Sequence, residues 1–449
     1  MNRTQLDFGT GPILPLLLKM SWPSIAAMLA MAFYNLIDTF WLTRLSPQAI
    51  AALTICFPIH MLFGAIGIGT GVGAGSFASR MFGAGKDVKA AQTAGQVIIL
   101  SALLGLIIIL LTIRYHDIIL KIFGATGDIL PLARQYLYTV VFGAPFLLFT
   151  MMTNNLLRAE GKPNESMNVI IAMSVTGMVL DPIFIFGWGP VPPMGIRGAA
   201  LAAIIAYFIA SVLSFYYLQL KPTKYILNWR YLIPNFSIIY SVYQTGFPSV
   251  IVNLTFGLVL IVYNYILGYF GSLAIATLGL CFRINGLVVM VFFGIGQGVM
   301  PLVGFNKGAG LHQRMIETVN IAVKISVIFS AIVFLLFELF ADPILLLFTN
   351  EADLREIAVP ALRIFVTMLL PVGPILVWIN MFIGLGKGIT SMILLMIRDA
   401  LLLIPTLFLL PTFFGLNGVW MAQPLSNALA FFIILFWTKR ELKMITKAI

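Results

Sequence analysis

The sequence consists almost end to end of apolar segments long enough to cross a lipid bilayer, separated by short polar connections. A helix that spans a hydrocarbon core of about 30 Å needs roughly 20 mostly apolar residues. Hydrophobic residues make up 60% of the 449 residues and charged residues only 10%, a balance that excludes a water-soluble globular protein. The chain is therefore predicted to be a multi-pass membrane protein whose helices carry its function.

Segments bounded by Gly, Pro and charged residues predict an all-α protein with twelve transmembrane helices. They cover residues 13–42, 48–78, 90–113, 129–157, 164–188, 195–219, 236–268, 272–303, 314–340, 357–384, 389–413 and 416–438. With the N-terminus in the cytoplasm, 17 Lys and Arg residues fall on the inner side and seven on the outer side. The positive-inside rule therefore places both termini in the cytoplasm.

Several other classes of protein do not fit this sequence. The net charge is +11, but the basic residues are dispersed in ones and twos, so no nucleic-acid partner is expected. Cys56 and Cys281 lie inside apolar segments and predict neither a disulfide nor a metal site. A phosphate-binding loop motif is absent, as is a cluster of polar catalytic groups. We therefore expect neither an enzyme nor a cofactor.

The clearest internal pattern is a repeat with an offset of 225 residues. Residues 49–59 match residues 274–284 at seven of eleven positions, and a Gly series in the first half recurs in the second at the same offset. Six helices per repeat is an even number, so the two halves are parallel repeats, with a cavity between them. This pattern predicts two six-helix lobes, residues 1–225 and 226–449, and favours a transporter that works by alternating access over a channel.

Two acidic residues are predicted to lie deep in the first lobe. Asp38 and Asp181 lie on helices that both rise from the cytoplasmic side, and both reach the outer half of the membrane, where Tyr136 joins them. Two carboxylates close together in a low dielectric do not both ionise easily, so at least one is expected to hold a proton. Such a pair is a proton relay or a sodium site. The alternative is that each Asp caps a helix or pairs with a base.

Other polar residues are candidates for binding the substrate. Tyr34 and Asn35 share the helix face of Asp38 and, with Asn154, are expected to line the cavity, although interhelical hydrogen bonding is an equally ordinary use of an Asn. In the second lobe, Arg283, Arg398 and Asp399 fall inside predicted helices, with a structural or a coupling role. Since adjacent residues on a helix point in different directions, Arg398 and Asp399 are not expected to pair with each other.

The sequence as a whole resembles the prokaryotic multidrug and toxic compound extrusion (MATE) family. The resemblance rests on residues 34–39 (YNLIDT) with 51–53 (AAL), 154–161 (NNLLRAEG), 180–187 (LDPIFIFG) and 195–202 (GIRGAALA). It implies efflux of drugs or metabolites across a prokaryotic plasma membrane, driven by inward flow of H⁺ or Na⁺. It also implies that Asp38, Asp181 and Tyr136 form the cation-responsive site and that Asn154 lines the cavity of the first lobe.

The sequence departs from the family pattern at two positions. Gly177 and Ala203 stand where many relatives carry Asn and Thr, so two oxygen ligands are lost. The coupling ion is therefore expected to be H⁺; Na⁺, the alternative, would bind Asp38 and Asp181. The expected partners are the lipid bilayer and amphipathic, often cationic, small molecules, and the protein is expected to be a monomer. The other function considered is a flippase for lipid-linked intermediates, which requires a strongly cationic cavity.

Overall fold

The structure is a computed structural model, and it describes residues 6–226 and 228–447. By internal contacts the chain divides into two compact units, one formed by residues 1–7 and 26–250 and the other by residues 8–25 and 251–449. The unit boundary on the first helix falls just after Pro23, and the boundary on the eighth falls just after Pro248. These two boundaries are themselves 225 residues apart.

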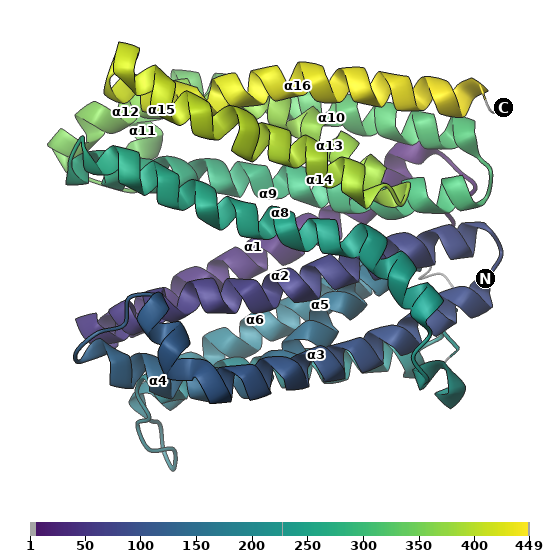
Figure 1. Cartoon of the computed structure of the whole chain (residues 1–449), viewed down its shortest axis with the longest axis horizontal. Coiled ribbons are helices and arrows are strands. Elements are labelled where there is room, and N and C mark those ends of the chain that lie inside the picture. Colours follow the sequence, from purple (N-terminus) through teal and green to yellow (C-terminus); the bar gives the residue numbers. More distant parts are fainter. Residues whose placement is uncertain (1–5, 227, 448–449) are drawn as a thin grey trace. The chain divides into compact units, whose positions relative to one another are not determined.

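The described residues are arranged almost entirely as long helices that lie side by side within each unit (Figure 1). The first half of the chain contains α1 (Ile13–Leu45), α2 (Pro47–Gly83), α3 (Asp87–Ile122), α4 (Ile129–Val140), η1 (Val141–Gly143), α5 (Ala144–Ala159), α6 (Pro163–Phe186), α7 (Ile196–Phe215), η2 (Tyr216–Leu220) and η3 (Trp229–Leu232). The second half contains α8 (Phe236–Gly268), α9 (Ser272–Gly308), α10 (His312–Leu339), α11 (Ala341–Leu346), α12 (Ala352–Val366), α13 (Leu369–Gly384), α14 (Gly388–Met396), η4 (Ile397–Leu402), α15 (Leu403–Phe414) and α16 (Leu416–Lys447).

Eleven spans of the described chain are long and apolar enough to cross a membrane, and a bent pair makes a twelfth. This confirms the predicted all-helical membrane fold. Several helices continue past the predicted ends: α3 runs from Asp87 to Ile122 and α16 runs to Lys447. The predictions stopped at charged residues, whereas a helix continues through the headgroup layer, where charged side chains are solvated.

The helix predicted over residues 357–384 is wrong in detail. It is two helices, α12 and α13, which meet at an angle of 45°. Pro371 has no N–H with which to bond the carbonyl of Thr367, and the chain makes shorter-range bonds there, from Met368 N to Phe365 O and from Leu370 N to Thr367 O.

The repeat is expressed in the packing of both units. Gly71 on α2 lies so close to α5 that a Cβ would stand 2.8 Å from Nδ2 of Asn155, and Gly296 on α9 is crowded in the same way by Asn380 on α13. Both Asn side chains donate to the carbonyl four residues earlier. Small residues let membrane helices approach closely, so the repeated Gly series has a packing role.

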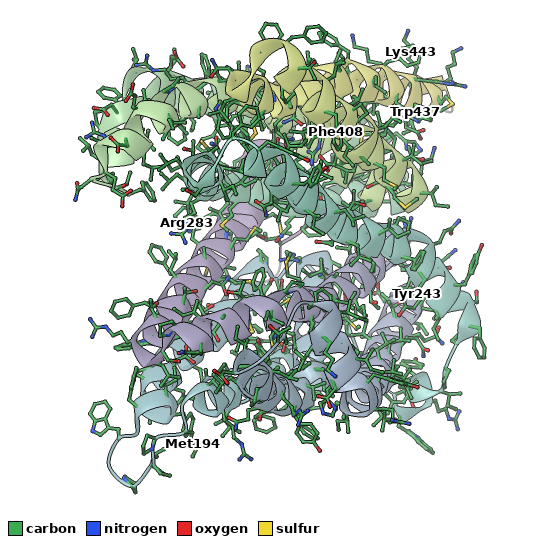
Figure 2. The ribbon with its side chains drawn as sticks, turned by 60° about the vertical axis from the view of Figure 1, so that its left-hand side comes forward. Met194, Tyr243, Arg283, Phe408, Trp437 and Lys443 are labelled. Carbon is green, nitrogen blue, oxygen red and sulfur yellow. The ribbon has the colours of Figure 1, made fainter. Side chains whose placement is uncertain are left out.

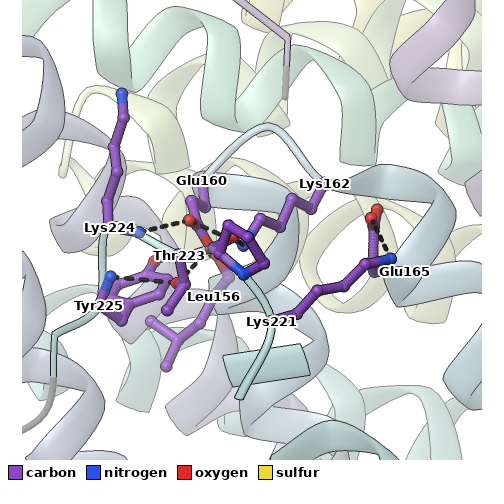
Figure 3. Close-up of polar contacts among 9 residues, drawn as sticks. Leu156, Glu160, Lys162, Glu165, Lys221, Thr223, Lys224 and Tyr225 are labelled. Atoms are coloured by element: carbon purple, nitrogen blue, oxygen red, sulfur yellow. Dashed lines mark hydrogen bonds and ion pairs between the residues drawn. The ribbon is translucent and has the colours of Figure 1, made fainter. Parts of the chain in front are cut away.

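The connection between the two halves is tied to the first unit by a buried ion pair. Nζ of Lys162 lies 2.9 Å from Oε1 of Glu160, and these side chains are 2% and 0% exposed (Figure 3). Glu160 also accepts hydrogen bonds from Oγ1 of Thr223 at 3.0 Å and from the backbone N of Lys224 at 2.7 Å. Lys162 donates to the carbonyl of Pro222 at 2.7 Å.

A second attachment lies further along the same connection. The side chain of Gln96 on α3 donates to the carbonyls of Tyr231 and Ile233 at 2.8 and 2.9 Å. Its oxygen accepts from the backbone N of Asn235 at 2.8 Å, just before α8 begins. The Glu160–Lys162 pair and Gln96 therefore fix both ends of the connection to the first unit.

We predict that Lys162→Met destabilises the protein by about 3–5 kcal/mol, because it leaves the buried carboxylate of Glu160 without a cation. Burial raises the pKa of Glu160 above its ordinary value of 4.5, with Lys162 and the hydrogen bonds acting in the opposite sense. The folded variant therefore holds a proton that the unfolded chain releases, so its stability rises as the pH falls from the raised pKa towards 4.5.

Thermal unfolding in detergent across this pH range measures both effects. The exposed Lys89→Met is the matched control and is expected to cost less than about 0.5 kcal/mol. A loss for Lys162→Met as small as the control's, or one that does not change with pH, would contradict the role assigned to the ion pair.

Candidate functional site

The centre of the candidate site is the carboxylate of Asp181 on α6. The side chain is fully buried, at 0% exposure, and neither oxygen has a hydrogen-bond partner among the described residues. Asp38 on α1 is half-buried and lies within electrostatic range of Asp181. The structure therefore brings the two predicted acids into one cluster.

Aromatic packing holds the C-terminal part of α1 against α6. The rings of Trp41 and Phe186 meet edge to face with their centroids 5.9 Å apart. About two turns away, the ring of Tyr34 occupies the space in front of Gly177, where even a Cβ would clash with it. The space that a side chain at position 177 would occupy is thus taken by an aromatic ring from α1.

Three tyrosines surround the acid pair. Tyr34 on α1, Tyr136 on α4 and Tyr207 on α7 are all within electrostatic range of both Asp38 and Asp181. Tyr136 and Tyr207 are only 7% and 6% exposed. The predicted neighbours Tyr34 and Tyr136 are therefore beside the acids, and Tyr207 is an additional member that sequence reasoning missed.

His60 on α2 is the other group that sequence reasoning missed. Its Nε2 lies 2.9 Å from the hydroxyl oxygen of Tyr207, and its Nδ1 is buried without a hydrogen-bond partner among the described residues. Depth along the chain would have found both residues. His60 is 13 residues into α2 and Tyr207 is 11 residues into α7, and both helices start at the side of the membrane where α1 ends.

The residues predicted to line the substrate cavity have different surroundings. Asn154 is buried, and its Nδ2 donates to the carbonyl of Ser166 at 2.8 Å, so its side chain ties α5 to α6. Asn35 is exposed, and its carbonyl accepts a hydrogen bond from Thr39.

The prediction that Arg398 and Asp399 do not pair is wrong. Nε and Nη2 of Arg398 donate to the two oxygens of Asp399 at 2.7 and 2.8 Å. Both lie in η4, a wider π-type turn, and a long guanidinium side chain can reach its sequence neighbour there. Arg283, by contrast, is exposed and extends away from the α9 ribbon (Figure 2).

The described residues contain no group of three or more His, Cys, Asp or Glu side chains suited to hold a metal ion. Asp38 and Asp181 are the carboxylates that a Na⁺ ion would use, with tyrosine hydroxyls and backbone carbonyls completing its shell. Gly177 and Ala203 supply no side-chain oxygen. Chemically, the cluster can bind and release a proton with its own groups alone.

Comparisons with known proteins identify the family of the chain. The sequence model of the MatE family matches residues 23–183 and 248–409. The multidrug export protein MepA of Staphylococcus aureus (strain MSSA476) is 29% identical over 415 residues, which cover 92% of this chain and 90% of that protein. An FAD transporter of Shewanella oneidensis is 26% identical over 423 residues, covering 94% and 93% of the two chains.

A solved structure described as the outward-facing conformation of a multidrug resistance MATE family transporter of the MOP superfamily superimposes with a TM-score of 0.92. It is 27% identical and covers 97% of each chain. The two segments that match the family model make up most of the chain and begin and end at corresponding places in its two halves. The chain belongs to the MatE family of multi-pass membrane transporters.

Proposed function

We propose that this protein is a proton-coupled antiporter that exports amphipathic, often cationic, drugs or metabolites by alternating access. The observation that carries the proposal is the buried carboxylate of Asp181, which has no hydrogen-bond partner among the described residues and lies beside Asp38. The names of the similar proteins, a multidrug exporter and an FAD transporter, support the substrate class.

A positive ion at the acid pair follows from the cost of burying charge. An ionised carboxylate removed from water is strongly destabilised unless it is paired or hydrogen-bonded. Asp181 has neither kind of partner among the described residues, so binding a proton satisfies it directly. The two carboxylates are expected to share the bound ion, because each disfavours the ionised form of the other.

The proton is favoured over Na⁺ by what surrounds the acids. A hard cation requires several oxygen ligands, and the space at Gly177 is filled by the ring of Tyr34. Ala203 is buried at 3% exposure and offers only a methyl group. A proton needs one oxygen of Asp181 or Asp38, which the cluster provides.

Coupling to the substrate is proposed to run along α1. This helix contributes residues 26–45 to the first unit and residues 13–25 to the second, and Pro23 lies at the changeover. Protonation of Asp38 changes its interactions in the outer half of α1, and a proline is the natural point at which a helix bends. The protein is expected to act as a monomer, with both of its termini in the cytoplasm.

The flippase function is less well supported. It requires unpaired positive charge for diphosphate groups, and the guanidinium of Arg398 is already occupied by both oxygens of Asp399. The relatives reported above carry no flippase name.

Proteoliposomes with separately imposed gradients test the driving ion. We expect an inward proton gradient to drive export of a lipophilic cation in the absence of Na⁺. An inward Na⁺ gradient at equal pH is expected to drive little export. Export that follows the Na⁺ gradient alone would show that Na⁺ is the coupling ion. Export that needs neither gradient would exclude coupling to an ion.

Replacement of the acids tests the site. Asp181→Asn and Asp38→Asn are expected to abolish gradient-driven export, by more than about tenfold, because an amide cannot exchange a proton. Asp128→Asn, an exposed acid in the same unit, is the control and is expected to transport normally. Normal transport by Asp38→Asn and Asp181→Asn, with normal expression, would exclude the pair from the mechanism.

A further inference from the structure

His60 is a buried polar group that the mechanism above does not use. It lies on α2 near the rings of Phe63 and Tyr207, with ring centroids 6.3 and 6.0 Å away. Its Nε2 is hydrogen-bonded to the hydroxyl of Tyr207 at 2.9 Å, and its Nδ1 has no partner among the described residues. A partly bonded imidazole inside a helical bundle needs an explanation.

The two nitrogens of a neutral imidazole are not equivalent, since one carries a proton and the other a lone pair. An orphaned buried N–H is rarer in proteins than an under-used acceptor. The unpartnered Nδ1 is therefore assigned as the lone-pair nitrogen, and the proton lies on Nε2. In this tautomer His60 donates to the oxygen of Tyr207.

That assignment fixes what Tyr207 can do. Its oxygen accepts from His60, so its own O–H is free to point elsewhere. The packing also limits the ring, because Tyr207 lies against Gly143 in the η1 break, where a Cβ would stand 3.0 Å from Cδ2 of the ring. The hydroxyl is thus held by its hydrogen bond to His60, and the ring that carries it is confined by the close approach of η1.

Besides His60 on α2, the charged and titratable groups near Tyr207 come from three elements. Asp38 and Tyr34 belong to α1, Tyr136 to α4 and Asp181 to α6. Helices α5 and η1 also pack on α7 and contribute no charge that bears on Tyr207. Both carboxylates lie within electrostatic range of Tyr207, and both oxygens of Asp181 lack a hydrogen-bond partner among the described residues, so a single water is enough to link the free O–H to the pair.

We infer that His60 is a positioning residue for the coupling site: by donating to Tyr207, it directs the Tyr207 O–H towards the Asp38–Asp181 pair and so sets the pH at which the pair releases its proton. This inference rests on the proposed function, since it assigns a new residue pair to the same proton site. A hydrogen bond to the ionised carboxylate stabilises the deprotonated pair, typically by about tenfold in its equilibrium.

The pH profile of transport tests the inference, measured as lipophilic-cation export driven by a fixed pH difference at a series of absolute pH values. His60→Phe keeps the ring packing and removes the donor, and Tyr207→Phe removes the hydroxyl. Each is expected to move the midpoint of the profile upward by about one pH unit, because the pair keeps its proton to higher pH. His60→Gln retains an amide donor and is expected to restore part of the shift.

The double variant separates a shared action from two independent ones. Because His60 acts through Tyr207, the His60→Phe/Tyr207→Phe midpoint is expected to equal that of Tyr207→Phe. His116→Phe and Tyr138→Phe, on α3 and α4 at the surface of the same unit, are matched controls and are expected to leave the midpoint unchanged. Thermal unfolding in detergent identifies a variant that is merely unstable. If His60→Phe is unstable, the midpoint of His60→Gln is used to test the inference instead.

The inference is overturned if the variants lower the maximal rate without moving the midpoint, or if the shifts of the two single variants add. Failure of the proposed function gives a different result, in which Asp38→Asn and Asp181→Asn still transport on a pH gradient. An unmoved midpoint in His60→Phe together with inactive Asp variants would reject only the role of His60.

Discussion

The buried carboxylate of Asp181 is the constraint on which the rest of the account depends. It is enclosed at 0% exposure, and neither oxygen has a hydrogen-bond partner among the described residues. A folded protein tolerates such a group only if it is neutralised for part of the time. Asp38, Tyr34, Tyr136 and Tyr207 surround it with groups that respond to its charge.

The internal repeat shows how the same packing carries different chemistry in the two halves. The 225-residue offset that relates Gly71 and Asn155 to Gly296 and Asn380 also relates Asp38 to Tyr263. Tyr263 is fully buried, and its hydroxyl donates to Gln423 at 3.2 Å. The backbone architecture is thus shared, whereas the position of a titratable acid in the first half is taken by a neutral phenol in the second.

His60 follows the same pattern, in which a titratable residue of the first half is replaced by a neutral residue in the second. Its counterpart at the same offset is Asn285, whose Nδ2 donates to the carbonyl of Cys281 at 2.9 Å. The second half instead carries the Arg398–Asp399 pair, in which each charge is balanced by its neighbour. This asymmetry favours the first half as the place of the proposed proton exchange, since Arg398 and Asp399 in the second half already balance each other.

Much of the architecture was predictable because it depends on long-range averages over the sequence. Membrane spans, the repeat and the depth of Asp38 and Asp181 follow from hydropathy and from the constant rise of a helix. The His60–Tyr207 contact, the Arg398–Asp399 pair and the bend between α12 and α13 were not predicted. Each depends on side-chain direction or on a local departure from α-helical geometry, such as η4, which periodicity does not report.

The connection between the halves was missed for a related reason. Glu160 and Lys162 appear in the sequence as ordinary charges at a helix end, and only the fold shows that Thr223 and Lys224 cover them. A charge's role is decided by its burial, and burial at a loop is set by how distant segments meet.

The most direct test of the central claim is to count the protons released when a lipophilic cation binds to the detergent-solubilised protein in weakly buffered solution. If the acid pair exchanges a proton for the substrate, the wild-type protein is expected to release about one proton per bound cation near the midpoint of its pH profile, and Asp181→Asn is expected to release none. Equal proton release by the wild-type protein and Asp181→Asn, or binding by the wild-type protein without any release, would contradict the account.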